Sequence, residues 1–341
     1  MASLSRWLRI TAVSVATVLV LAAAALALEW QDRPPVSALG WPVATPADDS
    51  GGRVTVTWLG ITTLLFDDGE TQILTDGTFT RLSAFDVLSQ RRVYSDLAAI
   101  NSGLAEFRVN RLAAIIPLHA HFDHVMDAGY VANRTTGIVL GSESAANVAR
   151  GAGVPVSQYQ ILADGESRQF GDFTITLLES AHAPLGPGDE TWFAGAITEA
   201  LEQPARVSDW KAGICWSVLI EHPQGTALVQ GSAGFIPGKL AGVQADVALL
   251  SVAGLSGLGR EYTERYWAET VAATGATRVF PIHFDDYTQP FGELVLLPEI
   301  IDDVPATARR LGALAAATSP PILIQRLPLG HPVPLFGRSR P

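Results

Sequence analysis

A chain of 341 residues, with 48% hydrophobic and 17% charged residues, can bury a large core, so an intrinsically disordered protein is excluded. Its net charge is −11 and no run of lysine or arginine stands out, which argues against a nucleic-acid-binding protein. The single cysteine, Cys215, excludes a disulfide framework within the chain and a thiolate-rich metal cluster.

The first 28 residues differ from the rest of the chain. Two arginines precede Ile10–Leu28, an uncharged apolar stretch of 19 residues. Ala25 and Ala27 form a pattern typical of signal-peptide cleavage sites, yet the stretch also approaches the roughly 20 residues that span a bilayer. We predict a signal peptide or a membrane anchor over residues 1–28, with a buried core helix as the alternative. A signal peptide or a membrane anchor would each place the domain outside the cytoplasm, either in the periplasm or anchored to the membrane.

The remainder predicts one α/β domain behind a linker. Residues 29–52 are rich in proline, aspartate and serine, which is typical of a linker, and the domain then covers residues 53–341. Apolar or alternating runs predict strands at Arg53–Phe66, Gln72–Thr75, Arg111–Leu118, Gly137–Leu140, Phe173–Leu178, Cys215–Glu221, Ala227–Gln230, Val247–Ser251, Arg278–Ile282 and Ile322–Arg326. Helices are predicted from Ser142, the expected N-cap, through Arg150, and at Tyr262–Thr274 and Val304–Ala317. The strands form two groups with helices between them, which predicts two sheets packed face to face with helices outside.

The strongest chemical signal is a histidine cluster directly after the predicted strand Arg111–Leu118. Residues 119–124 are His-Ala-His-Phe-Asp-His. In an extended segment His119 and His121 lie on the same side, and Asp123 and His124 can face a second point nearby. Neutral imidazoles and a carboxylate are ligands of Zn²⁺ or Fe²⁺, and an N/O site with an open position is catalytic in type. A solvated polar turn is the alternative.

Two more histidines follow predicted strands. His182 comes after Phe173–Leu178, and His283 comes after Arg278–Ile282. A single histidine in such a place is usually structural, but ligands at the ends of several strands can converge on one point. We therefore predict that both join the 119–124 cluster. His222 and His331 are predicted to lie on the surface.

These histidines, in this order and spacing, resemble those of the metallo-β-lactamase superfamily of metal-dependent hydrolases. Thr57–Gly60 and Leu74–Gly77 resemble the opening hairpin of its lactonase and phosphodiesterase-like branch, which includes N-acyl-phosphatidylethanolamine phospholipase D-like enzymes. The resemblance covers roughly residues 53–328. It implies a four-layer αββα sandwich with metals at one edge of the sheets.

The resemblance also implies how the ligands divide between one or two zinc ions, with iron and manganese as open alternatives. His119, His121 and His182 would hold one ion, and Asp123, His124 and His283 would hold the other. The family's bridging aspartate normally follows the strand after the third histidine, but the aligned residue here is Ser232. A neutral hydroxyl is a poor ligand, so the second ion would bind weakly unless a nearby carboxylate replaces the aspartate.

Three aspartates are auxiliary candidates. Asp285 and Asp286 lie next to His283 and are the candidates to replace the missing carboxylate; a turn or helix cap is the alternative. Asp76 is a candidate to orient a ligand imidazole through its other nitrogen, or is a plain turn residue. Ile61 occupies a place where relatives often have a histidine.

The predicted function is a hydrolase acting on an ester, lactone, amide or phosphodiester. A bound dication lowers the pKa of water to about 7 and so makes hydroxide available, and Asp123 would orient or deprotonate the attacking water. Two loops, Phe79–Tyr94 and Ala183–Gly213, carry apolar side chains that would wall a pocket for a small-molecule or lipid-like substrate, or only pack on the sandwich. The alternative function, motivated by Ser232, is a metal-binding protein of the same fold with weak or no catalysis.

Overall fold

The computed structural model describes residues 14–15, 17–18, 20–21, 30–47 and 52–337. The signal peptide or anchor predicted for residues 1–28 lies almost wholly outside these described residues and stays a prediction. Within them, none of the helices combines the length and the apolar character that crossing a membrane requires.

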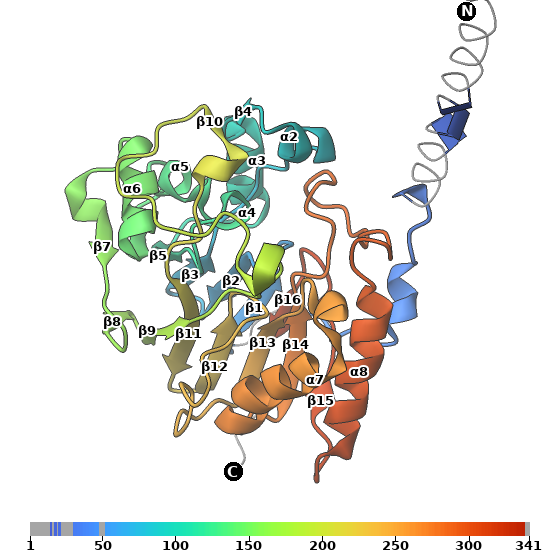
Figure 1. Ribbon diagram of the computed structural model, residues 1–341. Coiled ribbons are helices and arrows are strands. Elements are labelled where there is room, and N and C mark those ends of the chain that lie inside the picture. Colours follow the sequence, from blue (N-terminus) through green and yellow to red (C-terminus); the bar gives the residue numbers. More distant parts are fainter. Residues whose placement is uncertain (1–13, 16, 19, 22–29, 48–51, 338–341) are drawn as a thin grey trace, which may run out of the picture.

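In the described part of the chain, the domain is built on two seven-stranded sheets that lie face to face (Figure 1). The order of the first sheet is β16 (Pro332–Pro334), β1 (Thr55–Trp58), β2 (Leu64–Asp67), β3 (Gln72–Thr75), β5 (Leu112–Ile116), β6 (Ile138–Gly141) and β7 (Tyr159–Ile161). The order of the second is β15 (Leu323–Ile324), β14 (Arg278–Ile282), β13 (Val247–Ser251), β12 (Gly225–Gln230), β11 (Cys215–His222), β9 (Phe173–Ser180) and β8 (Ser167–Phe170).

Both sheets are mixed. β3, β5, β6 and β7 are parallel neighbours, as are β12, β13, β14 and β15. The other pairs in these sheets, including β11 with β12 and β9, are antiparallel. Because parallel strands need crossover connections, helices cover the outer faces of these regions.

Alternation along the strands separates an inner and an outer core. Phe66 of β2 and Ile116 of β5 face inward and join Phe173 of β9 and Val218 of β11 in one fully buried cluster between the sheets. Neighbouring side chains of the first sheet, such as Ile115, point outward into a second cluster that helices cover.

The helices form the two outer layers. On the side of the first sheet lie α2 (Ala84–Ser89), α3 (Leu97–Glu106), α4 (Phe122–Val125), α5 (Ala128–Ala132) and α6 (Glu143–Gly151). On the second sheet lie α7 (Leu255–Trp267), which continues as a π-helical segment Ala268–Ala272, and α8 (Val304–Ala317), side by side (Figure 1). The predicted αββα sandwich is confirmed. A small sheet of β4 (Arg92–Val93) and β10 (Ala205–Arg206) ties the two predicted loops together.

Two local predictions were wrong. The run Arg53–Phe66 is not one strand, because a turn at 60–63 divides it into β1 and β2; Ile61 in this turn has a left-handed backbone with φ 53°. The helix expected at Tyr262–Thr274 begins earlier, at Leu255. By contrast, Ser142 caps α6 as predicted, its side chain accepting a hydrogen bond from the Ala145 amide.

Part of the predicted linker packs on the domain. Trp41 and Ala44 are buried, and the Ala44 amide donates to the Arg326 carbonyl. The Arg33 guanidinium lies 2.6 Å from the Asp286 carboxylate. Residues 33–44 therefore contribute to the core on the side of α8, which a composition typical of linkers did not indicate.

The alternation in β9 gives a test of the inner core. Leu177 is fully buried between the sheets, whereas Thr174 on the other face of the same strand is half-buried. We expect Leu177→Ala to lower the free energy of unfolding by about 2–5 kcal/mol, because it removes buried methyl groups and leaves a cavity. Thr174→Ala, the matched control, should change it by less than about 1 kcal/mol. Urea unfolding monitored by circular dichroism measures both, and equal losses would contradict the inner-core assignment.

Candidate metal centre

The cluster 119–124 lies where β5 gives way to helix α4. His121 is the N-cap of α4 and is still extended, with φ −69° and ψ 156°, whereas Asp123 and His124 lie in the first helical turn. This change from extended to helical backbone directs the side chains of the motif to two neighbouring points. All of its histidines are buried.

The structure brings His119, His121 and His182 together. Their ligand atoms all lie within 4.8 Å of one another, and His119 Nε2 is 3.0 Å from His121 Nδ1. His182 comes from the segment directly after β9, so the second sheet supplies the third member. The prediction that a histidine after this strand converges on the motif therefore agrees with the geometry.

The outer nitrogens of two of these imidazoles are already held by backbone carbonyls. His121 Nε2 lies 2.8 Å from the Trp192 carbonyl, and His182 Nδ1 lies 2.8 Å from the Ala183 carbonyl. Since a carbonyl oxygen only accepts, each of these nitrogens carries the proton and donates it. The remaining nitrogens, His121 Nδ1 and His182 Nε2, are then unprotonated in the neutral ring and free to bind a cation.

Asp123, His124 and His283 form the second group. Asp123 Oδ2 is 3.5 Å from the Nε2 atoms of both His124 and His283. His283 follows β14 and has a left-handed backbone with φ 57°, fixed by a hydrogen bond from its amide to the Ile61 carbonyl at 2.9 Å. A non-glycine residue in this region is strained, and such strain is concentrated at functional sites.

Asp76 orients His124. Its Oδ2 lies 2.9 Å from His124 Nδ1, and its Oδ1 accepts the Leu118 amide at 2.7 Å. The Thr62 hydroxyl also donates to the carboxylate. Asp76 is fully buried, so the geometry favours the orienting role over that of a plain turn residue. Thr62 was missed by sequence reasoning, because a threonine in a turn carries no signal of its own.

The electrostatics of both groups suit a dication. Burial lowers the pKa of His121 to about 4 and that of His182 to about 3, and neighbouring histidines add to the effect, so both rings are neutral at pH 7. Burial disfavours a charged carboxylate at Asp123, but the imidazoles of His124 and His283 outweigh it and hold its pKa below the usual range. The neutral imidazoles of His121 and His182 and the charged carboxylate of Asp123 belong to a donor set that fits zinc or a similar ion.

The other auxiliary candidates lie in different places. Ser232 is buried beside the centre, where its hydroxyl oxygen accepts the Ala183 amide at 3.0 Å. Both oxygens of Asp285 accept the Ile61 amide, and Asp286 pairs with Arg33. Neither aspartate belongs to the two ligand groups, so the structure does not bring in a carboxylate from 285–286 to replace the one that Ser232 lacks.

Five of the six candidate ligand residues, all except His119, line the floor of a cavity of about 630 Å³. Ser232, Ser251 and Ala253 line it from the second sheet, and Tyr287 from the segment after His283. Its upper walls come from both predicted loops; the residues concerned are Val87, Leu88, Gln90, Leu185, Trp192, Phe193 and Ser208. The loop prediction is thus supported for Leu88, Trp192 and Phe193, whereas Ile197 and Trp210 are packed in the outer core.

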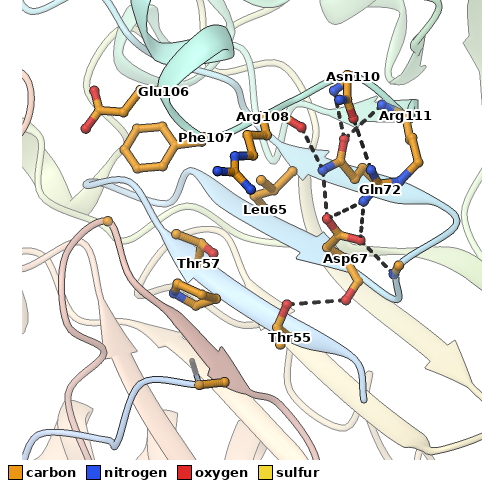
Figure 2. Close-up of a pocket in the computed structure, with 14 residues that line it drawn as sticks. Thr55, Thr57, Leu65, Asp67, Gln72, Glu106, Phe107, Arg108, Asn110 and Arg111 are labelled. Carbon is orange, nitrogen blue, oxygen red and sulfur yellow. Dashed lines mark hydrogen bonds and ion pairs between the residues drawn. The ribbon is translucent and has the colours of Figure 1, made fainter. Parts of the chain in front are cut away.

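A second hollow, of about 710 Å³, lies on the outer face of β1 to β3 and is shown in Figure 2. It contains none of the predicted site residues. The side chain of Gln72 bridges Asp67 and the backbone amides of Asn110 and Arg111, and Arg111 pairs with Asp67 at 2.9 Å. These polar groups already pair with one another. We therefore choose the cavity lined by the histidines as the candidate site, because of its metal-binding side chains and although it has the smaller volume.

His222 was predicted to lie on the surface, and this was wrong. Its side chain is only 5% exposed and packs against Phe173, with ring centroids 5.0 Å apart. Its Nδ1 accepts the Gln224 amide, and Nε2 faces Asp68 at 3.6 Å. It is the last residue of β11, paired with Gly225 of β12, and is not among the residues that line the candidate cavity.

Comparison with known proteins is consistent with this centre. No protein-family model matches the chain. The UPF0173 metal-dependent hydrolase of Xanthobacter autotrophicus is 27% identical over 166 residues, which are 46% of this chain and 60% of that protein, so the match spans less than two thirds of the relative.

Solved structures with a similar arrangement include an isothiocyanate hydrolase from Delia radicum gut bacteria (15% identity, TM-score 0.49, 82% of this chain and 98% of that chain). Another is the metallo-β-lactamase fold protein YhfI from Bacillus subtilis (14% identity, TM-score 0.46, 82% and 98%). The αββα sandwich and the order of the six candidate ligand residues agree with the resemblance to the metallo-β-lactamase superfamily, and the curated relative is named as a metal-dependent hydrolase.

Asp76→Asn tests the orienting contact. Asparagine has the same shape and tolerates the left-handed backbone of this position, where φ is 52°, but it replaces the charged acceptor opposite His124 by a neutral amide. We expect metal affinity, measured by competition with a chelator, to fall about 10- to 100-fold. The exposed Asp32→Asn is the control. An unchanged metal affinity in Asp76→Asn would contradict the orienting role and show that Asp76 is only a structural turn residue.

Proposed function

We propose that this protein is a metal-dependent hydrolase that holds one or two zinc ions. The observation that carries the proposal is the pair of buried or partly buried ligand groups, His119, His121, His182 and Asp123, His124, His283, of which all members except His119 line one open cavity. Such nitrogen and oxygen donor sets are typical of catalytic zinc, while iron and manganese are compatible with the same atoms.

A bound dication would lower the pKa of water and polarise a carbonyl or phosphoryl oxygen. The chain's own residues then have separate tasks. Asp123 stays ionised and orients the attacking water, accepting its hydrogen bond. His124 is fixed by Asp76, and His121 is fixed by the Trp192 carbonyl, so neither ring has to reorganise during the reaction.

The cavity walls favour an uncharged, partly apolar substrate. Leu88, Leu185, Trp192, Phe193 and Tyr287 surround the ligand groups, and within the described residues no lysine or arginine lines the cavity. A phosphodiester, which carries one negative charge, would find no lysine or arginine on these walls to contact its non-reacting oxygens. We therefore favour an ester, lactone or amide with an apolar, lipid-like acyl group over a phosphodiester.

The proposed location is outside the cytoplasm, either periplasmic or held at the membrane by residues 1–28. The support is the uncharged stretch Ile10–Leu28 behind two arginines. The acidic balance of the chain and the lack of a basic run support a small molecule rather than a nucleic acid as the partner.

The second candidate is a metal-binding protein of this fold without turnover. It is favoured by one observation, the neutral Ser232 beside the two ligand groups. A metal-loaded chain that hydrolyses none of a broad panel of esters, lactones, amides and phosphodiesters would establish this alternative.

Removal of a ligand tests the proposed function. We expect His121→Ala to lower hydrolysis of a p-nitrophenyl acyl ester by more than about 100-fold, because it opens the first ligand group. A chelator should abolish the wild-type rate, and added Zn²⁺ should restore it. The exposed His331→Ala should behave as the wild type. Full activity in His121→Ala, or after complete metal removal, would exclude the metal-dependent reaction.

Two apolar residues of α2 test the acyl pocket. Leu88 lines the cavity, whereas Phe85, on the same short helix, is equally apolar and exposed but does not line it. We expect Leu88→Ala to raise the KM for an octanoyl ester about fivefold with little effect on an acetyl ester, because the longer chain loses apolar contact. Phe85→Ala should change neither value. A uniform loss across chain lengths would contradict an acyl pocket at this wall.

A further inference from the structure

Two serines lie together beside the ligand groups, at the ends of neighbouring parallel strands. Ser232 follows β12, and Ser251 is the last residue of β13. One hydroxyl, that of Tyr266, donates to the carbonyl oxygens of both, at 3.3 and 2.9 Å. Both serines also line the cavity that contains the candidate ligand histidines. The fold therefore brings the backbones of two serines together, and both residues lie at the wall of the cavity that holds the candidate metal centre.

Neither hydroxyl proton has a partner in the described structure. Ser251 is fully buried, and its Oγ makes no hydrogen bond within the described residues. Ser232 Oγ accepts the Ala183 amide at 3.0 Å, which leaves its own proton to donate. A buried hydroxyl without a partner is unfavourable, so an orphaned Ser251 at the wall of a cavity indicates a ligand that accepts hydrogen bonds there.

The charge of the centre indicates the sign of that ligand. Five of the six ligand side chains are imidazoles, and Asp123 is the single carboxylate among them. Two dications would bring four positive charges against this carboxylate and that of Asp76, which contacts His124. Asp285 and Asp286 do not correct the balance, since they bind the Ile61 amide and Arg33. An anion next to both groups would stabilise the second dication in a site of low dielectric.

We propose that Ser232 and Ser251 form a subsite for a small carboxylate anion from solution, of the class of formate, acetate or hydrogencarbonate. The two hydroxyls donate to its oxygens, and its charge stabilises occupation of the second ligand group. A planar carboxylate suits two donors on adjacent strands better than a spherical halide does. The inference rests on the metal-binding part of the proposed function.

The test measures metal binding and needs no substrate. The purified full-length protein is titrated with Zn²⁺ against a chelator in sodium formate and in sodium chloride of equal ionic strength, and zinc per chain is counted by mass spectrometry. We expect the affinity for the second zinc to be about tenfold higher in formate. Ser251→Ala should lose this difference, and Ser232→Asp should bind two zinc ions equally well in both salts, because it carries its own carboxylate.

Ser217→Ala is the matched control, since Ser217 is a buried serine on β11 whose hydroxyl is already paired with Gln230 at 2.6 Å. It should keep the formate dependence, and circular dichroism should show that all variants are folded. A wild-type affinity that is the same in formate and chloride, or a formate dependence that survives Ser251→Ala, would overturn the subsite. Folded wild-type protein that binds no zinc in either salt would overturn the proposed function itself.

Discussion

The hydrogen bonds of Asp76 are the interaction on which the rest of the centre depends. Its carboxylate joins the end of β3, the amide at the end of the β5 segment, the Thr62 turn and the imidazole of His124. A fully buried charge is tolerated only when such donors surround it. The single carboxylate of Asp76 accepts hydrogen bonds from all of these groups. The position of His124 therefore depends on how the strands of the first sheet are aligned.

The second sheet contacts the first-sheet side of the centre through two residues with strained backbone conformations, Ile61 and His283. His283 lies at the end of β14, yet its amide binds the Ile61 carbonyl, and Ile61 in turn donates its own amide to Asp285. Ile61 and His283 both have left-handed backbones. Asp285, a candidate for the replacement carboxylate with a turn residue as the alternative, therefore contacts the backbone of the Ile61 turn. Through Ile61, Asp285 helps to position the candidate ligand His283 but does not itself belong to either ligand group.

Much of the sandwich could be predicted from the sequence because its strands have clear signals. β13 and β14 are continuous apolar runs, and β9 alternates over its whole length. The convergence of the six candidate ligand residues could be predicted because the histidine spacing is rare and two further histidines follow strands. The division of β1 from β2 could not, because the turn residues Ile61, Thr62 and Thr63 are β-formers whose conformation is set by Asp285, more than 200 positions away. The burial of Trp41 depends in the same way on distant contacts.

The contact of Arg33 with Asp286 has a geometric consequence for the proposed membrane-bound form. Arg33 also donates to the Leu296 carbonyl, so the first packed residues of the domain contact the same loop region that follows His283. Position 28 and Arg33 are five Cα-to-Cα steps apart in the sequence, which can span at most about 18 Å. A tether this short would allow the domain only a narrow range of tilts over the bilayer. The rate of substrate capture would then depend on lateral diffusion within the lipid as well as on concentration in water.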